Sequence, residues 1–307
     1  MNLAVLALII TNIIWGASPP IYKLALENIP PFTLAFMRFF IAALIFLPLS
    51  LKFWRRITLK DMFYICLSAF FGITVNISFF FLGLQDGISI NSTLIASAGP
   101  VFIFLLAIIF FKEKFHPKIF IGMMIALIGV LVIVFSPYLN GYQDSKVNLT
   151  IANLFFVIAT IGAVIDPLIA KKVLGRVHFI QFSAISFLFA SWSFLPMMYG
   201  ELQTWSFSQI NLWGLIGILY GAILASTLAY TLFYYGISKI VASEIGLFMY
   251  IDPVITVMIA MPLLGEYPSK MYFFGAAFVI LGIYLAEGRI HWHPLHKLKT
   301  QNLNDKV

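Results

Sequence analysis

Long apolar runs, repeated along the whole chain, restrict the possible folds more than any other feature of the sequence. Ten runs of about twenty mostly apolar residues follow one another, and each is long enough for a helix that crosses the hydrocarbon core of a bilayer. They cover residues 3–23, 33–51, 61–84, 90–111, 118–137, 149–171, 179–199, 212–237, 241–264 and 271–287. This pattern predicts an all-α integral membrane protein with ten transmembrane helices.

The composition excludes a water-soluble enzyme. Apolar residues make up 62% of the 307 residues, charged residues only 10%, and the mean hydropathy is +0.99. The one cysteine, Cys66, cannot form an internal disulfide or a cysteine-based metal site, and we expect no metal and no cofactor. The net charge of +7 does not predict a nucleic-acid partner, because the basic residues lie between the apolar runs.

The distribution of lysine and arginine predicts the orientation. With the N-terminus in the cytoplasm, the inside segments hold 15 of these residues and the outside segments only 2. Positive residues concentrate on the cytoplasmic side of membrane proteins. Both termini are therefore expected to be cytoplasmic, in a multi-pass protein of a bacterial-type plasma (inner) membrane. Residues 288–307 are expected to form a basic cytoplasmic tail.

The two halves of the chain resemble each other. A shift of 153 residues aligns the third to fifth runs with the eighth to tenth. The aligned pairs include Phe80 with Phe233, Gly83 with Gly236, Pro100 with Pro253, Glu113 with Glu266, Gly122 with Gly275 and Gly129 with Gly282. Residues 1–137 and 149–287 are therefore two repeats of five spans. Since five is odd, the second repeat is expected to be inverted, as in many secondary transporters.

Several of these residues also form a familiar signature. They are Trp15-Gly16-Ala17-Ser18 with Lys23, Arg38-Phe39, and two copies of a longer motif, Gly99-Pro100-Val101 leading to Glu113 and Asp252-Pro253-Val254 leading to Glu266. With these the chain resembles the EamA-like family of the drug/metabolite transporter superfamily. The resemblance implies ten helices in a five-plus-five inverted repeat and transport of amino acids, drugs or other small metabolites. It also implies a central cavity among spans one to four and six to nine.

The first span carries a polar and aromatic stripe. Asn12, Trp15, Pro19, Tyr22 and Lys23 share one helical face, which is typical of a substrate path. The adjacent prolines at 19 and 20 are expected to break the helix, and broken spans occur at wet cavities or inside protein. The alternative is a packing face in which Asn12 forms a hydrogen bond to another helix.

Further cavity candidates lie in the third, fourth, eighth and ninth spans. Tyrosine offers an apolar ring and a hydroxyl, which suits an amphipathic organic substrate. The alternatives are anchoring at the membrane interface for the tyrosines and simple packing for Phe80. The candidates are Asn76, Phe80, Ser97, Tyr230, Tyr234 and Tyr250.

Charged residues inside the spans are costly and are therefore candidates for function. Asp252 could carry a proton or contact a cation, or it could cap a helix interrupted by proline. For Asp166, the capping interpretation is favoured. Arg38, together with Lys23, could attract a substrate carboxylate, or it could extend to the interface or pair with Glu27.

Other recurring residues are expected to be structural. Glu113 and Glu266 lie at span ends, where we expect them to cap helices or to pair with Lys114 or Lys270. Four glycines are predicted to allow close helix contact, because small residues let backbones approach. These are Gly122, Gly129, Gly275 and Gly282.

These observations predict a secondary transporter, and not an enzyme, that exports small organic solutes by alternating access. No nucleotide-binding loop is present, so an ion gradient is the candidate energy source, with protons as the candidate ion. The alternatives are a facilitative channel and an intramembrane protease using Asp166 and Asp252. The expected partners are a small-molecule substrate and the lipid bilayer, with the chain as a monomer or loose dimer. The predicted substrate-binding residues are Asn12, Trp15, Tyr22, Arg38, Asn76, Phe80, Ser97, Tyr230, Tyr234, Tyr250 and Asp252.

Overall fold

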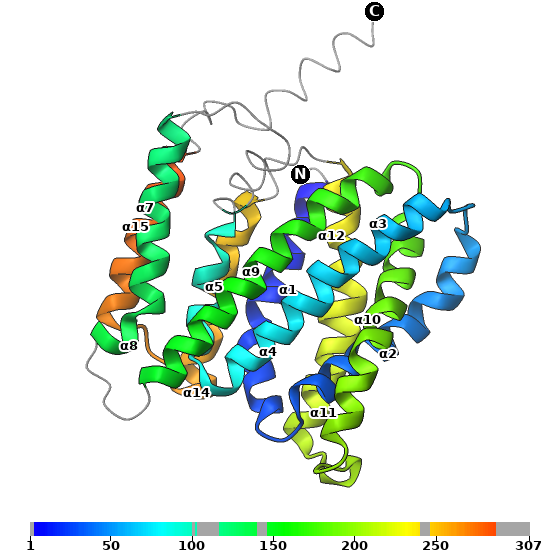
Figure 1. Ribbon diagram of the computed structural model, residues 1–307, viewed down its shortest axis with the longest axis horizontal. Coiled ribbons are helices and arrows are strands. Elements are labelled where there is room, and N and C mark those ends of the chain that lie inside the picture. Colours follow the sequence, from blue (N-terminus) through cyan, green and yellow to red (C-terminus); the bar gives the residue numbers. More distant parts are fainter. Residues whose placement is uncertain (1–2, 100–101, 103–116, 140–145, 240–245, 287–307) are drawn as a thin grey trace, which may run out of the picture.

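The computed structural model describes residues 3–99, 102, 117–139, 146–239 and 246–286, and over these residues the chain forms helices and no strands (Figure 1). Among the described residues, six helices are long and apolar enough to cross a membrane. They are Leu3–Leu26, Pro31–Lys52, Leu59–Asp86, Asn148–Leu174, Phe179–Glu201 and Leu212–Lys239. The all-helical prediction is confirmed for the part of the chain that the structure describes.

The remaining predicted spans correspond to shorter helices. Phe120–Val134, Phe248–Leu264 and Lys270–Gly282 are apolar helices in the regions of the fifth, ninth and tenth predicted spans. Half of the fourth predicted span, residues 90–111, lies outside the described residues, as does Glu113. Large apolar side chains face outward around the bundle, such as Trp192 and Met258, as expected for a surface in contact with lipid.

Within the two halves, long helices are divided into segments of different geometry. The first half consists of α1 (Leu3–Leu26), α2 (Pro31–Lys52), α3 (Leu59–Ala69), the π-helix η1 (Phe70–Val75), α4 (Asn76–Asp86), α5 (Ser89–Ala96), α7 (Pro117–Val134) and α8 (Ser136–Leu139). The second half consists of α9 (Lys146–Leu174), α10 (Phe179–Glu201), η2 (Phe207–Gln209), α11 (Leu212–Leu219), the π-helix η3 (Tyr220–Leu228), α12 (Ala229–Lys239), η4 (Gly246–Tyr250), α14 (Ile251–Leu264) and α15 (Lys270–Ala286).

Helix boundaries in the two halves repeat at the same interval as the sequence. The segments α4 and α12 both begin and end 153 residues apart, and the preceding π-helices η1 and η3 end 153 residues apart. The residues that cap the N-termini of α3 and α11, Thr58 and Asn211, are also 153 residues apart. Each accepts a hydrogen bond from a backbone N–H of its helix. The two halves therefore share backbone irregularities as well as residue types.

The contacts between helices follow a two-fold pattern. Corresponding helices of the two halves pack directly on each other in two places. These are α2 against α10 and α7 against α15, at opposite sides of the bundle (Figure 1). Other contacts occur in pairs, because α1 packs on α12 as α9 packs on α4, and α1 packs on α14 as α9 packs on α5. Such paired contacts are what an approximate two-fold axis between two similar halves produces.

The first helices of the two halves run in opposite directions. Gly87, just after α4, accepts a hydrogen bond from Lys23 near the end of α1, and it also lies close to Ala152 near the start of α9. In Figure 1, α1 leads away from the labelled N-terminus, whereas α9 approaches that end of the bundle. The end of α1 thus lies beside the beginning of α9.

Glycines allow α7 and α15 to cross closely, as predicted. A Cβ added at Gly129 would lie 2.6 Å from the carbonyl oxygen of Gly275, and one at Gly282 would lie 2.4 Å from that of Gly122. Real Cβ atoms do not approach backbone atoms so closely, so only glycine permits this contact.

The prediction that Pro19 and Pro20 break the first helix is wrong, because α1 runs without interruption through both residues. Prolines lack an N–H, so the carbonyls of Trp15 and Gly16 lose their helical donors. Hydroxyl groups replace these donors: Ser18 Oγ donates to Trp15 O at 2.7 Å, and Thr256 Oγ1 of α14 donates to Gly16 O at 2.6 Å. In this way the helix stays intact inside the bundle.

Candidate functional site

A cavity of about 1160 Å³, including the space at its mouth, lies between the two halves. Both halves contribute side chains, mostly apolar and aromatic with a few polar groups, which is typical of a site for a small organic molecule. The polar side chains around it are Asn12, Ser18, Arg38, Asn76, Ser92, Thr93, Thr160, Asp166 and Asp252. The aromatic ones are Trp15, Phe80, Phe156, Tyr230 and Phe233.

Seven of the eleven predicted binding residues line this cavity. They are Asn12, Trp15, Arg38, Asn76, Phe80, Tyr230 and Asp252. Asn12 forms no hydrogen bond to another helix among the described residues, and its Nδ2 donates to Leu8 O within α1, at 2.7 Å. Asn76 does reach another helix, since its Nδ2 donates to Ala159 O of α9 at 2.8 Å.

The other four predicted residues lie behind or beyond the cavity wall. Tyr22 is buried, its ring packs on Phe81, and its hydroxyl has no partner among the described residues. The Ser97 hydroxyl donates to Leu94 O within its own turn. Tyr234 donates a hydrogen bond to Asp166, and Tyr250 packs half-buried against the core.

Aromatic rings form one wall. Trp15 lies against Tyr230 and Phe233, with ring centroids 5.2 and 5.0 Å away. The indole Nε1 of Trp15 donates to Ala225 O at 3.1 Å. Ala225 lies within the π-helix η3, and such segments are frequent at functional sites. The bond orients a large flat apolar surface toward the cavity.

Arg38 is the buried cation of the site, with 2% of its surface exposed. Its Nε donates to Ser226 Oγ at 2.7 Å, and its guanidinium lies 4.7 Å from the ring centroid of Phe39. The two structural alternatives for Arg38, an extended side chain at the interface and a pair with Glu27, are both wrong. A guanidinium held in this way keeps N–H groups available for a carboxylate or another acceptor.

Asp252 places a carboxyl group at the cavity and at the start of α14. It is the second residue of that helix, where the N-terminal dipole favours a negative charge. Its Oδ1 is buried and has no hydrogen-bond partner among the described residues. Buried polar atoms without partners are rare and costly, so this oxygen suits a donor that a bound solute supplies.

Asp166 lines the cavity from α9, and the capping interpretation for this residue is wrong. The helix continues through Pro167 to Leu174, and the carboxylate accepts hydrogen bonds from the side chains of Ser68 and Tyr234. Asp166 and Asp252 line the same cavity, and no hydrogen bond joins them within the described residues. The carboxyls of a protease dyad, by contrast, share a proton. The described residues contain no group of three or more His, Cys, Asp or Glu side chains that could hold a metal ion.

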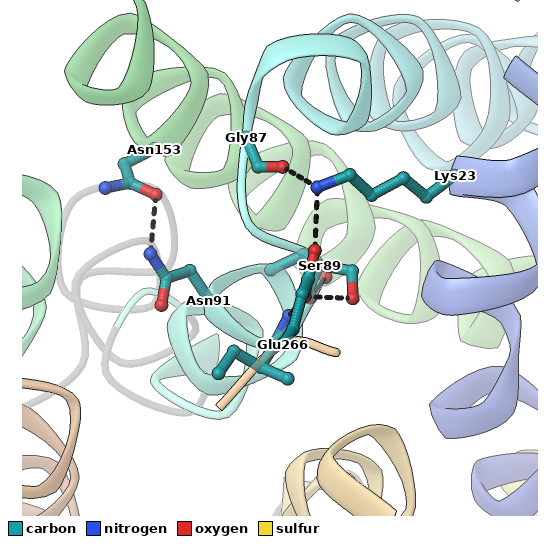
Figure 2. Close-up of polar contacts among 8 residues, drawn as sticks. Lys23, Gly87, Ser89, Asn91, Asn153 and Glu266 are labelled. Carbon is teal, nitrogen blue, oxygen red and sulfur yellow. Dashed lines mark hydrogen bonds and ion pairs between the residues drawn. The ribbon is translucent and has the colours of Figure 1, made fainter. Parts of the chain in front are cut away.

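A polar cluster lies beyond the cavity on the side where α1 ends (Figure 2). Lys23 Nζ pairs with Glu266 Oε1 at 2.7 Å and donates to Gly87 O at 2.6 Å. Glu266 Oε2 accepts from Ser89 Oγ at 2.6 Å and from the backbone N–H of Ile90 at 3.3 Å. The structural role expected for Glu266 is confirmed, but its partner is Lys23 instead of Lys270. Lys23 is therefore engaged and does not act beside Arg38.

A neighbouring amide pair fixes the start of α5 from its other side. The Asn91 Nδ2 donates to Asn153 Oδ1 of α9 at 3.1 Å, and the Asn153 Nδ2 donates to two carbonyls at the end of α7. The two sets of contacts lie side by side in Figure 2. Together they connect α1, α5, α9 and the segment after α14 at this end of the bundle.

Sequence reasoning underestimated Asp166 and left out several small polar residues of the cavity. A carboxylate inside a span is itself a signal of function, and that signal was present for Asp166. Thr160 and Ser92 carry no comparable signal, because serine and threonine are common wherever membrane helices pack. Their place in the cavity wall is known only from the packing.

Comparisons with known proteins agree with this architecture. The model of the EamA-like transporter family matches residues 2–135 and again residues 150–287. A Bacillus subtilis (strain 168) protein, named as the uncharacterized transporter YetK, is 29% identical over 88% of this chain and 82% of its own. An Escherichia coli (strain K12) protein, named as a probable amino-acid metabolite efflux pump, is 24% identical over 96% of this chain and 97% of its own.

The fold is also found in a solved structure. A crystal structure superimposes with a TM-score of 0.63 at 17% sequence identity, and the match covers 94% of this chain and 99% of the other. At this identity the likeness concerns the fold alone. Because the match covers nearly the full length of both chains, it includes both halves of this chain.

Proposed function

Because this chain belongs to the EamA-like transporter family, we propose that it is a secondary transporter that exports small organic solutes, such as amino acids or related metabolites, across the plasma membrane. The proposal includes ten transmembrane helices in two inverted repeats, with both termini in the cytoplasm. It also includes the proton gradient as the energy source. The printed name of the Escherichia coli relative supports the class of solute.

The cavity between the repeats is the observation that supports this function. It combines an aromatic wall with a buried guanidinium, Arg38, and a carboxyl oxygen without a partner, on Asp252. A solute with an apolar body and both an acceptor and a donor group matches these features. We assign the donor group of the solute, such as an ammonium group, to Asp252 and its acceptor group to Arg38.

Alternating access requires each end of the cavity to close in turn. On the side where α1 ends, two layers of contacts cover the cavity. Tyr22 packs against Phe81 and Tyr220, and the pair of Lys23 with Glu266 follows one residue further along α1. Under the proposed orientation this is the external side, and the structure then corresponds to a state closed to the outside.

The first experiment is a thermal-shift screen of the purified chain against amino acids, nucleosides, sugars and cationic drugs. A solute that binds the folded state raises its apparent stability by mass action. A solute that does so is then tested for flux in proteoliposomes with and without a pH gradient. Specific flux of one class of solute supports the proposal. If solutes bind but none of them is transported, the proposal is contradicted.

Asp252→Asn tests the assignment of the solute's donor group. A charge-assisted hydrogen bond contributes roughly 1.5–3 kcal/mol, so we expect affinity for the solute found in the screen to fall by about 10- to 100-fold. Asp61→Asn is the matched control, because Asp61 pairs with Arg176 and does not line the cavity. Unchanged affinity in Asp252→Asn would show that the solute lies elsewhere.

A further inference from the structure

The carboxylate of Asp166 is held by two hydroxyl groups from two other helices. Ser68 of α3 donates to Oδ1, and Tyr234 of α12 donates to Oδ2 at 3.0 Å. Asp166 belongs to α9 and has only 4% of its surface exposed, yet it lines the cavity. Three helices from both repeats therefore meet at one carboxylate.

The surroundings of this carboxylate are tightly packed. A Cβ added at Gly72 of η1 would lie 2.3 Å from the Cβ of Asp166, so the glycine allows the close approach. Tyr234 is fixed by Phe182 of α10, with ring centroids 4.7 Å apart, and by the neighbouring Tyr230 at 5.8 Å. Tyr230 and Tyr234 are the titratable groups that face this site from α12. Neither of the two ion pairs among the described residues involves Asp166.

This arrangement can satisfy the carboxyl group in both protonation states. An ionised carboxylate accepts from both hydroxyls, as in the structure. When a proton binds to Oδ1, the new O–H can donate to Ser68 Oγ. The hydrogen of Ser68 can then turn to Asp166 O, which already lies 3.3 Å from Ser68 Oγ. Among the described residues, the Asp252 carboxyl has no such partner for its Oδ1.

We infer that Asp166, with Ser68 and Tyr234 as positioning residues, is the proton-binding site that couples solute transport to the proton gradient. The inference rests on the proposed function, and it assigns a different role to each of the two carboxylates. Asp252 contacts the solute, whereas Asp166 takes a proton from water on one side and returns it to water on the other. The chemical step is the reversible conversion of a carboxylate and a proton into a carboxylic acid.

The geometry also links protonation to movement. Hydrogen bonds to an ionised acceptor are roughly twice as strong as those to a neutral one, so the ionised carboxylate holds α3 and α12 to α9 more firmly. Proton binding weakens both bonds at once. A ligand shifts a conformational equilibrium when it interacts differently with the two states, and the proton fulfils this condition here.

Infrared difference spectroscopy of the purified full chain tests proton binding without any solute. Acidification should produce the carbonyl band of a protonated carboxylic acid, and we expect the Asp166 component to be lost in Asp166→Asn. It should shift in frequency in Tyr234→Phe and in Ser68→Ala, because each removes one hydrogen bond. Tyr235→Phe is the matched control, since the Tyr235 ring packs on Phe179 and should leave the band unchanged.

The second measurement follows the conformation. A cysteine placed in the cavity wall at Ala96, in a Cys66→Ser background, reports access for a water-soluble maleimide. Because maleimide reacts with the thiolate, each labelling rate is divided by the rate of a free thiol at the same pH. We expect this relative labelling rate to depend on pH, and this dependence to be lost in Asp166→Asn and retained in Asp166→Glu and Asp252→Asn. If Asp166→Asn does not fold, the Tyr234→Phe band shift still decides the question.

The two proposals fail differently. An acid-induced band and a labelling rate that are the same in Asp166→Asn as in the unmodified chain would overturn the proton site and leave transport untouched. A site that titrates as expected, in a protein that moves no solute in liposomes, would overturn the proposed function. A relative labelling rate that responds to sodium and not to pH would replace the proton by a metal cation and also overturn the inference.

Discussion

Two prolines in the middle of α1 leave two backbone carbonyls that need other donors, and hydroxyl groups supply them. Ser18 does so from within α1, but Thr256 does so from α14, and its Oγ1 also lies 2.8 Å from Asp252 O. Thr256 is fully buried, so water cannot take its place. One hydroxyl therefore ties the repaired turn of α1 to the turn of α14 that carries Asp252.

At the residue scale, Thr256→Val should destabilise the protein although it keeps the side-chain shape. The substitution leaves Gly16 O buried without a donor, which costs roughly 1–3 kcal/mol. We expect a lower apparent melting temperature in detergent than for Thr231→Val, the matched control. The hydroxyl of Thr231 donates only to Thr227 O among the described residues, one turn earlier in the same continuous span Leu212–Lys239. Equal melting temperatures would show that the carbonyl of Gly16 finds another partner.

At the scale of elements, the two π-helices are the clearest common feature of the halves that the sequence did not reveal. In η3, Ala225 O accepts hydrogen bonds from Trp15 Nε1 and from Arg38, at 3.1 and 3.3 Å. A π-helical turn exposes backbone carbonyls, and here the carbonyl of Ala225 orients two side chains of the cavity. The irregular turns thus position cavity residues in a way that a regular helix would not.

The crossing of α7 and α15 gives a prediction at the same scale. Gly282→Ala should separate the two helices, because the new Cβ would lie 2.4 Å from both Ala126 N and Gly122 O. These are backbone atoms that cannot turn away, so we expect a loss of about 1–3 kcal/mol, typical of overpacking. Gly200→Ala in α10 is the control, since nothing lies within 4 Å of the added atom. Denaturation of both variants in detergent compares them directly.

At the scale of the whole molecule, the described residues form one ion pair near each end of the bundle. Lys23 pairs with Glu266 where α1 ends, and Arg176 pairs with Asp61 where α9 ends, at 2.7 and 2.6 Å. They differ in their surroundings. The side chains of the first pair are 25% and 11% exposed, whereas Arg176 is 60% exposed, so solvent screens the second pair more strongly. The first pair also holds the start of α5 through Ser89.

Breaking the first pair should favour a state that is open on that side. In Glu266→Gln we expect faster maleimide labelling of the cysteine at position 96 from the side where α1 ends, by a few-fold. Arg176→Gln, which breaks the pair at the other end, is the control and should not increase labelling from that side. Labelling that is equally slow in both variants would show that the aromatic layer around Tyr22 closes the cavity without help from the ion pair.

The sequence alone determined the order of the apolar segments that the structure describes as helices, the internal repeat, and four of the nine polar residues that line the cavity. The reason is that hydrophobic length and helical spacing are properties of a single segment. Asn12, Trp15, Asn76 and Phe80 could be placed at the cavity because helical periodicity shows which residues share a face.

Only the tertiary structure decided which groups are partners. Lys23 could have faced a solute and instead binds Glu266, and Asp166 could have capped a helix and instead joins Ser68 and Tyr234. Pro19 and Pro20 could have broken α1, but the hydroxyl of Thr256 comes from a segment more than two hundred residues away. Periodicity along one helix does not specify which helix lies opposite, because that depends on the packing of both repeats together.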